Sequence, residues 1–353
     1  LYLELSLTRK CNLDCLFCGR REVDKEVKNS EEHLSKEEFI EIVEQAGRLG
    51  VKKLHIGCQI GEPSLTTEKT ISVMETAKKF DMVGSIVTNG TEFTESDLEK
   101  LIDLEWNSII FSLYSTVPEL HDEITNTEGS FRKSIMNIAK LIDRKHDRGK
   151  KEPRVSLAFV PTKKNYKQLG EFVRLASDLG ADEILVEPMI VYHEIGEELS
   201  LSDSQKSEFE DVLEEASILA EKLDIDGNFV EIKESIAEQP NCSYKPSDQE
   251  KDQIKSRDFF SMYCFSPWLK MCVSSEGAVN PCPSLWEKKG VNWRKSSLKE
   301  IWEGDYFKRY RQKIKRGDLP KDCEECCVPL YLEMSREPKK ELERIKGIKL
   351  KGK

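Results

Sequence analysis

Short hydrophobic runs alternate with amphipathic stretches along the first two thirds of the chain. The runs are rich in aliphatic and β-branched residues, which is typical of buried strands, and they cover residues 3–7, 53–57, 83–87, 108–113, 155–160 and 183–186. The stretches repeat apolar residues at helical spacing and predict helices over residues 36–49, 67–80, 95–104, 131–146, 166–179 and 203–223. The pattern therefore predicts six strand–helix units in series.

The ends of these helices have recognisable signals. Ser35 and Glu38 form a capping-box pattern, and Gly50 and Gly180 stand where two helices should end. Six such units imply an α/β fold with a parallel sheet and helices outside it. Right-handed crossovers allow either a curved, partial barrel or an open doubly wound sheet, and the periodicity does not choose between them.

The last third of the chain loses this alternation. Residues 237–260 are polar and contain two prolines, as expected for a linker. Glu276 and Gly277 indicate a hairpin turn between strands at 271–274 and 278–281, and residues 298–315 have a helical pattern. We therefore expect a barrel-like domain at 1–225, a linker at 226–260, a small cysteine-rich domain of hairpin plus helix at 261–330, and a basic tail at 331–353.

Composition narrows the functional classes. The chain has 353 residues, of which 38% are hydrophobic and 34% charged, with a net charge of −10. This charge argues against bulk binding to nucleic acid or to an anionic membrane. No run approaches the roughly 18–20 apolar residues of a membrane span, and the first residues lack a signal-peptide pattern. We expect a cytoplasmic protein whose basic tail is a solvated last helix.

The eleven cysteines are the main chemical signal of the sequence. A chain without a secretory signal seldom forms disulfides, so we expect metal ligation. Cys11, Cys15 and Cys18 follow the first strand as C-x₃-C-x₂-C. Three thiolates on one loop suit three irons of a [4Fe–4S] cluster and leave one iron open to a small molecule. Zinc with a fourth ligand elsewhere, or free core cysteines, are the alternatives.

The triplet is followed by Gly61-Glu62-Pro63, Thr88-Asn89-Gly90 and Phe111-Ser112-Leu113, in this order and each at or after a predicted strand. As an ordered set, these segments and the triplet closely resemble the radical S-adenosylmethionine (radical SAM) enzymes. The resemblance covers roughly residues 1–225 and implies a partial (β/α)6 barrel. It also implies that SAM is bound by Phe17, Gly61, Glu62, Pro63, Thr88, Asn89 and Ser112. Two positions depart from the family pattern, because Ile60 replaces a glycine and Tyr114 replaces an acidic residue. Residues 121–124 and 129–131 match a further family stretch.

The resemblance also implies the chemistry. SAM chelates the open iron, the reduced cluster donates one electron, and the C–S bond breaks to give methionine and a 5′-deoxyadenosyl radical. That radical abstracts a hydrogen atom from the substrate. The protein binds and orients the partners and excludes water and oxygen. An electron donor such as flavodoxin or ferredoxin is expected.

The C-terminal cysteines resemble the SPASM/twitch domains of radical SAM enzymes, which hold auxiliary clusters. The shorter twitch version binds one [4Fe–4S] cluster, and the matching ligands here are Cys264, Cys282, Cys323 and Cys326. Cys327 competes with Cys326 as the last ligand, and Cys272 is interpreted as a small buried hydrophobe. A zinc-binding knuckle is the alternative for this group. The spacing is similar to that of a twitch-type dehydrogenase that oxidises an aminocyclitol.

Three other residues are candidates near the substrate, although no catalytic residue is assigned. Cys58 and Cys242 are weighed as hydrogen-atom donors against simple packing, and Glu187 at the end of the sixth strand is weighed as a contact to SAM or substrate against a turn cap. His55 and His193 are interpreted as structural, and Trp286, Trp293 and Trp302 as packing between domains.

The main functional hypothesis is a radical SAM oxidoreductase. It oxidises a sugar or aminocyclitol, and the auxiliary cluster accepts the remaining electron. The alternative is modification of a ribosomal peptide by thioether formation, carbon–carbon crosslinking or epimerisation. Because the cluster motif begins at Cys11, the sequence leaves no room before it for a leader-binding domain, which counts modestly against the peptide hypothesis. A non-catalytic iron–sulfur electron carrier is the third hypothesis.

Overall fold

One curved sheet organises the molecule. The computed structural model describes residues 1–23, 33–57, 60–192, 194–237, 264–285 and 290–316. Within these residues, ten strands form one sheet in the order β10-β9-β8-β1-β2-β3-β4-β5-β6-β7. Consecutive strands pair in parallel through β1 (Tyr2–Leu5), β2 (Lys53–Ile56), β3 (Val83–Thr88), β4 (Ser108–Ser112), β5 (Arg154–Phe159), β6 (Glu183–Val186) and β7 (Asp226–Gly227). The six predicted strands are present, each with ends within two residues of the prediction.

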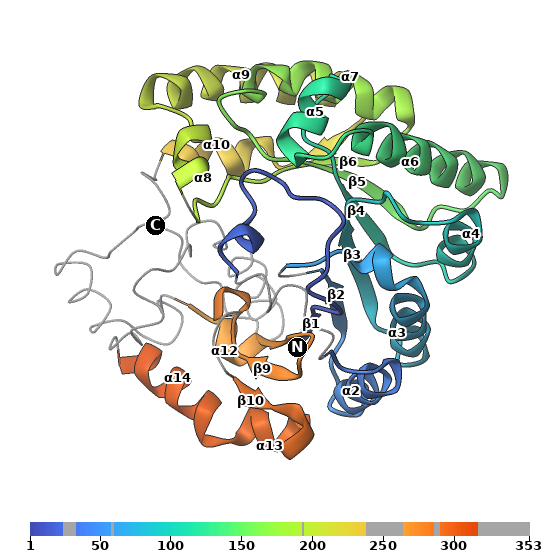
Figure 1. The fold of residues 1–353 in the computed structure, drawn as a ribbon, viewed down its shortest axis with the longest axis vertical. Helices are drawn as coiled ribbons and strands as arrows, with labels where there is room; N and C mark the ends of the chain where they lie inside the picture. The colour runs from blue at the N-terminus through green and yellow to red at the C-terminus, as the bar shows by residue number, and fades with distance from the viewer. Residues whose placement is uncertain (24–32, 58–59, 193, 238–263, 286–289, 317–353) are drawn as a thin grey trace, which may run out of the picture.

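Helices follow one another along the outer side of this sheet (Figure 1). They are α2 (Lys36–Arg48), α3 (Thr67–Lys79), α4 (Glu95–Asp103), α6 (Ser130–Asp147), α7 (Leu169–Leu179) and α9 (Asp203–Lys222). The chain also contains α5 (Pro118–Thr125), α8 (Glu194–Leu199) and α10 (Phe229–Ala237). Short 3₁₀ turns occur at η1 (Gly19–Glu22), η2 (Pro63–Thr66) and η3 (Tyr166–Gln168). The structure therefore has the curved arrangement, and the open doubly wound sheet is excluded.

Local sequence signals explain several helix ends. Ser35 accepts a hydrogen bond from the Glu38 amide, and Glu38 accepts one from the Ser35 amide, so the predicted capping box is present. Gly50 and Gly180 have φ angles of +80° and +75°, which glycine adopts at little cost. The predicted helix over residues 166–179 divides into η3 and α7.

The two faces of the sheet have opposite character. On the helix side, Leu3, Leu54 and Ile86 are fully or almost fully buried in the main apolar core. On the concave side, the strand register places Glu4 beside His55 of β2, and His55 beside Ser85 of β3. His55 Nδ1 and Ser85 Oγ are 2.8 Å apart, which agrees with the structural role expected for His55. The interior of the partial barrel is therefore polar where its first strands meet.

The cysteine-rich segment continues the same sheet. It contains α12 (Ser266–Leu269), β8 (Lys270–Val273), β9 (Ala278–Asn280), η5 (Pro283–Leu285), β10 (Val291–Asn292), η6 (Trp293–Lys295), α13 (Leu298–Glu303) and α14 (Asp305–Arg316). The predicted hairpin is present as β8 and β9. Strand β8 also pairs in parallel with β1, so residues distant in the sequence form neighbouring strands.

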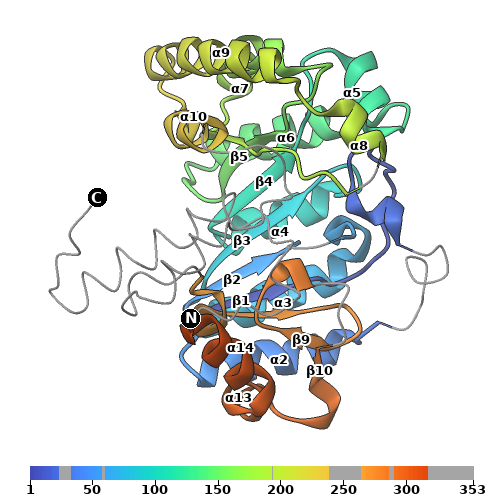
Figure 2. The same cartoon turned by 90° about the vertical axis from the view of Figure 1, so that its left-hand side faces the viewer.

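Two parts of the C-terminal half differ from the expectations. The helix predicted over residues 298–315 is two helices, because Gly304 between them is extended, with φ −78° and ψ 171°. Residues 226–237, which we expected to belong to a linker, contain β7 and α10, and α10 packs against α9. Helix α13 packs against α2 (Figure 2), and Arg294, which precedes α13, pairs with Glu38 of α2. Within the described ranges, no helix is long and apolar enough to cross a bilayer.

Candidate active site

The loop after β1 brings the first three cysteines to the carboxyl end of the sheet. Its backbone is tied to the end of α5, because the Asp14 amide donates to the Thr125 carbonyl at 3.2 Å and the Leu16 amide donates to the Ile124 carbonyl at 2.8 Å. Arg21 closes the loop by donating to the Cys15 carbonyl at 3.1 Å. The loop is therefore fixed by hydrogen bonds at several points along its length.

The three thiols of this loop are close enough to influence one another. Burial raises the pKa of Cys11 to about 12 and raises the pKa values of Cys15 and Cys18 as well. The Leu13 amide donates to Cys11 Sγ and the Arg20 amide donates to Cys18 Sγ, each at 3.4 Å, and such bonds favour the thiolate. Bound iron favours thiolates further, so this donor set fits an iron–sulfur cluster.

This arrangement differs from a site for a single metal ion. Among the residues that the structure describes, no group of three His, Cys, Asp or Glu side chains meets the geometry for one ion. In a cubane cluster each cysteine binds a different iron, so the thiols need not converge on one point.

Glu62 joins the ends of β2 and β3. It is 3% exposed, and its carboxylate accepts hydrogen bonds from the Ser64 amide at 2.7 Å, Thr88 Oγ1 at 2.5 Å and the Asn89 amide at 2.7 Å. Burial raises the pKa of Glu62, and these donors partly offset the rise. The structure thus brings Glu62, Thr88 and Asn89 together, whereas their contacts with SAM stay a prediction.

Gly61 allows the chain to pass close to the cysteine loop. Its φ angle is +104°, and a Cβ atom there would lie 1.9 Å from the Thr8 carbonyl oxygen. The next amide, of Glu62, donates to the Lys10 carbonyl at 2.8 Å. The glycine therefore permits the backbone contact that connects the Gly61–Pro63 segment to the start of the cluster loop.

Asn12 is a site residue that sequence reasoning missed. Its side-chain oxygen accepts from Asn89 Nδ2 at 3.0 Å, and its Nδ2 donates to Thr91 Oγ1 at 2.7 Å. These bonds connect the cysteine loop to the turn after β3. The only signal in the sequence was a polar residue directly after Cys11, which does not indicate a partner near residue 90.

Aromatic side chains cover one side of the cysteine loop. The rings of Phe17 and Tyr114 meet edge to face with centroids 5.0 Å apart, and Tyr114 stacks on His121 at 5.8 Å. Tyr114 belongs to a small apolar cluster with Ile124 and Val160, against which Phe17 and Cys15 pack. Ser112, also predicted to bind SAM, ends β4 on the concave side and is half-buried. Phe17 therefore lies where a flat, apolar ligand group would be well supported.

The family-like stretch at residues 121–131 has a structural role. The Asp122 carboxylate accepts from the amides of Gly129 and Phe131 at 2.6 and 2.9 Å, so it caps α6. Burial opposes ionisation of Asp122, but these hydrogen bonds hold its pKa below the usual value. His121 Nδ1 accepts from the Tyr114 amide at 3.2 Å, which keeps that nitrogen unprotonated.

Glu187 follows β6 and is solvent-accessible, although the surrounding protein raises its pKa by desolvation. Its charge also contributes to the raised pKa of Tyr114, after the larger effect of burial and that of Cys15. Glu187 therefore lies on the same side of the barrel as the Phe17–Tyr114 pair.

Cys264 and Cys282 form a second pair of neighbouring thiols. Ser266 connects their two segments, because its amide donates to Cys264 Sγ at 3.4 Å and its hydroxyl donates to the Pro281 carbonyl at 2.6 Å. Burial, and next the nearby Cys282, raise the pKa of Cys264 to about 12. A pair of half-buried, neighbouring thiols fits two ligand positions of an iron–sulfur cluster. The predicted partners Cys323, Cys326 and Cys327 lie outside the described residues, as do Cys58, Cys242, His193 and Trp286.

Cys272 is buried, as expected, but it is not surrounded only by apolar groups. Its thiol donates to Glu4 Oε2 at 3.2 Å, and Lys270 Nζ lies 2.5 Å from Glu4 Oε1. Neither Glu4 nor Lys270 was singled out from the sequence, because their pairing depends on the contact of β1 with β8.

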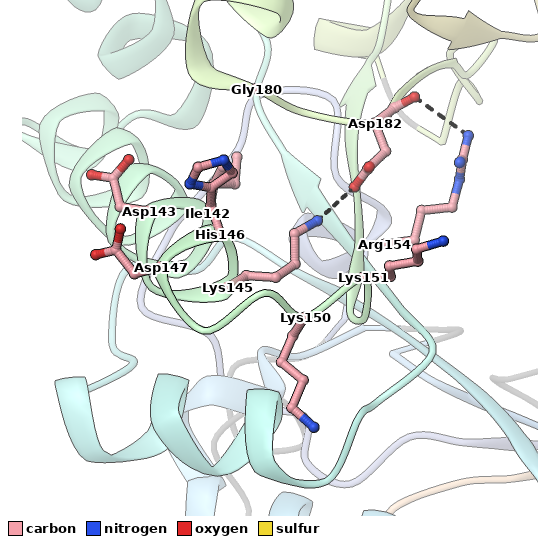
Figure 3. Close-up of a pocket in the computed structure, with 10 residues that line it drawn as sticks. All are labelled: Ile142, Asp143, Lys145, His146, Asp147, Lys150, Lys151, Arg154, Gly180 and Asp182. Atoms are coloured by element: carbon pink, nitrogen blue, oxygen red, sulfur yellow. Dashed lines mark hydrogen bonds and ion pairs between the residues drawn. The ribbon is translucent and has the colours of Figure 1, made fainter.

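A hollow of about 770 Å³ lies away from these groups (Figure 3). It is lined by charged residues of α6, of the start of β5 and of the turn before β6, including Lys145, Arg154 and Asp182. Lys145 Nζ lies 3.0 Å from Asp182 Oδ2, and Arg154 donates to the Asp182 carbonyl at 3.3 Å. Because this hollow is at the amino end of β5, whereas the cysteine loop follows the carboxyl end of β1, it is separate from the candidate active site.

Comparison with known families agrees with this geometry. The family model of the radical SAM superfamily matches residues 5–176, and the model of an iron–sulfur cluster-binding domain called SPASM matches residues 264–327. The chain belongs to the radical SAM superfamily and has a C-terminal SPASM-type domain. Its cofactors are therefore a [4Fe–4S] cluster, SAM and an auxiliary cluster.

Two relatives illustrate the range of similarity. The tungsten-containing aldehyde ferredoxin oxidoreductase cofactor-modifying protein of Pyrococcus furiosus is 30% identical over 189 residues, which are 54% of this chain and 51% of the relative. The chain thus matches about half of that protein. The PqqA peptide cyclase of Rhizobium meliloti is 24% identical over 330 residues, which are 90% of this chain and 78% of the relative.

Solved structures show the same fold. The crystal structure of Streptococcus suis SuiB bound to its precursor peptide SuiA has a TM-score of 0.65 and 17% identity, covering 95% of this chain and 73% of SuiB. SuiB has also been solved bound to S-adenosylmethionine. The partial barrel with a cysteine-rich domain is thereby confirmed.

Proposed function

We propose that this chain is a radical SAM enzyme that modifies a peptide. The observation that supports this most directly is the similarity to the PqqA peptide cyclase, because it extends over 90% of the chain. The fold shared with SuiB, which was solved with a precursor peptide, is consistent with it. The proposal therefore follows the alternative hypothesis from the sequence, peptide modification, and not the main one, oxidation of a sugar or aminocyclitol.

Oxidation of a sugar or aminocyclitol has less support. That hypothesis depended on the spacing of four cysteines, of which two lie outside the described residues. The similarities that cover at least 90% of this chain involve, by contrast, a peptide cyclase and a protein solved with a precursor peptide.

The residues have distinct tasks in this proposal. Cys11, Cys15 and Cys18 hold the cluster that, with SAM bound, supplies hydrogen abstraction. Glu62 holds Thr88 and Asn89 in place beside the cysteine loop, and Phe17 with Tyr114 supports an apolar part of SAM on the other side. Cys264 and Cys282 contribute to the auxiliary cluster, and Glu187 presents an accessible carboxylate to the substrate side.

A peptide assay tests the proposal. The reconstituted, reduced full chain is incubated with SAM and with short peptides encoded beside its gene, and the products are analysed by liquid chromatography and mass spectrometry. We expect 5′-deoxyadenosine together with a peptide whose mass or stereochemistry has changed, and no change with the Cys11/Cys15/Cys18→Ala variant. Unchanged peptides together with an oxidised sugar or aminocyclitol in a parallel assay would overturn the peptide proposal.

A further inference from the structure

Lys270 is a buried cation at the junction of the two domains. It begins β8 directly after α12 and is 4% exposed. Its ammonium lies 2.5 Å from Glu4 of β1, which is itself 3% exposed. Burial of both charges is costly unless they are paired in good geometry, so this ion pair has a defined position.

The same lysine is next to the thiols of the auxiliary site. Only α12 separates Cys264 from Lys270 in the chain, and Ser266 of that helix holds the Cys264 segment against Pro281, which precedes Cys282. The antiparallel register of β8 with β9 pairs Cys272 with Asn280. Lys270 precedes Cys272 by two residues and Cys282 follows Asn280 by two, so both lie at the same end of this strand pair.

We propose that Lys270, held in place by Glu4, sets the reduction potential of the auxiliary cluster bound by Cys264 and Cys282. One-electron reduction adds one negative charge to a cluster, and a fixed cation nearby favours that state. Glu4 has two effects, since it orients the cation and partly cancels its field. Lys270 is thus a positioning and tuning residue that acts through the cluster without touching the substrate.

This inference rests on the auxiliary-cluster part of the proposed function and not on the identity of the substrate. Replacing Lys270 and replacing Glu4 should shift the reduction potential in opposite directions. A purely structural role of the pair would not predict opposite shifts. Lys270→Met removes the cation and should make the potential more negative. Glu4→Gln removes the anion, leaves the cation and should make the potential more positive.

The test is an anaerobic redox titration followed by electron paramagnetic resonance. It uses the full chain with Cys11, Cys15 and Cys18 replaced by Ala, so that the auxiliary cluster alone contributes to the signal. We expect the order of potentials to be Glu4→Gln highest, then the unmodified background, then Lys270→Met lowest. Lys270→Arg should stay close to the background, and Lys299→Met on the exposed side of α13 should not shift, because solvent and salt screen that charge.

Each outcome decides the question. Equal potentials in all variants, or shifts in the same direction for Glu4→Gln and Lys270→Met, overturn the inference while leaving the auxiliary cluster intact. If Lys270→Met loses its iron, the positive shift in Glu4→Gln and the unchanged Lys270→Arg still test the proposal. A background protein without any cluster would contradict the auxiliary site itself, and this inference with it.

Discussion

At the residue scale, the candidate site is made of polar groups whose partners are mostly other parts of the chain. Glu62 accepts from Ser64, Thr88 and Asn89, and Asp122 accepts from the first amides of α6. The sequence indicated these residues because they match family segments, but it assigned several of them to SAM. Their observed contacts show that they also fix the loops around the cysteines.

Replacing Glu62 tests that supporting role. In Glu62→Gln, one carboxylate oxygen that accepts hydrogen bonds in the wild type becomes an NH₂ group, which is itself a donor. The donors that face it then lack an acceptor, so we expect a loss of about 1–3 kcal/mol in the free energy of unfolding. Glu68→Gln is the matched control, because Glu68 pairs with Lys36 at the surface, where solvent screens the two charges and the pair contributes little stability. Urea denaturation measures both, and equal, small losses would contradict the role given to Glu62.

His121 gives the site a pH dependence. Burial lowers the pKa of His121 to about 4, against about 6.5 in the unfolded chain, so the folded protein binds its proton less readily. The stability that this group contributes is complete above the unfolded pKa, and it is lost as the pH falls from about 6.5 to 4.

We therefore expect the free energy of unfolding of His121→Asn to fall less steeply than that of the wild type over this range. The Asn oxygen is placed to accept from the Tyr114 amide in place of Nδ1. Denaturation at a series of pH values measures the slope, and identical slopes would exclude His121 as the cause.

At the element scale, the sequence predicts individual strands and helices well but does not predict contacts between distant segments. The six strands and their helices follow from periodicity and caps, because each element is specified by residues within it. The break at Gly304 was missed because one glycine interrupts an otherwise continuous helical pattern. The pairing of β8 with β1 was missed because it joins residues more than 260 positions apart. The sequence of either strand alone does not determine their register.

A substitution at Gly61 tests the contact between the loop after β2 and the cysteine loop after β1. In Gly61→Ala the new Cβ meets the Thr8 carbonyl, and the φ angle of +104° adds strain, so the start of the cysteine loop must move. Gly149→Ala is the control, because Gly149 also has a positive φ, of +61°, but has no atom within 4 Å of the added Cβ.

We expect Gly149→Ala to cost about 1–2 kcal/mol of stability and to retain SAM cleavage. Gly61→Ala should cost more stability and should also reduce SAM cleavage. Denaturation and 5′-deoxyadenosine formation are measured side by side, and full cleavage by Gly61→Ala would contradict the close contact of this segment with the cysteine loop.

At the scale of the whole molecule, the barrel and the cysteine-rich domain share one sheet. The contact includes β1 with β8, the Glu4–Lys270 pair and the packing of α13 on α2. A chain that ends at residue 237 would expose the edge of β1 and would lack Lys270 and Cys272, the partners of Glu4.

We expect this truncated chain to aggregate or to unfold at a lower temperature than the full chain. The matched control is the full chain with Cys264 and Cys282 replaced by Ala, which removes the two proposed auxiliary ligands but keeps β8. Thermal unfolding compares the three proteins. A truncated chain as stable as the full one would show that the barrel does not depend on the shared sheet.

The most direct test of the account combines iron content with SAM cleavage. Two cubane clusters predict about eight irons per chain in the reconstituted wild type, and about four in the Cys11/Cys15/Cys18→Ala variant and in the Cys264/Cys282→Ala variant. Reduced wild type should form 5′-deoxyadenosine from SAM, and the variant without the first three cysteines should not. Wild-type levels of cleavage in that variant would contradict the assignment of the active site to the loop after β1.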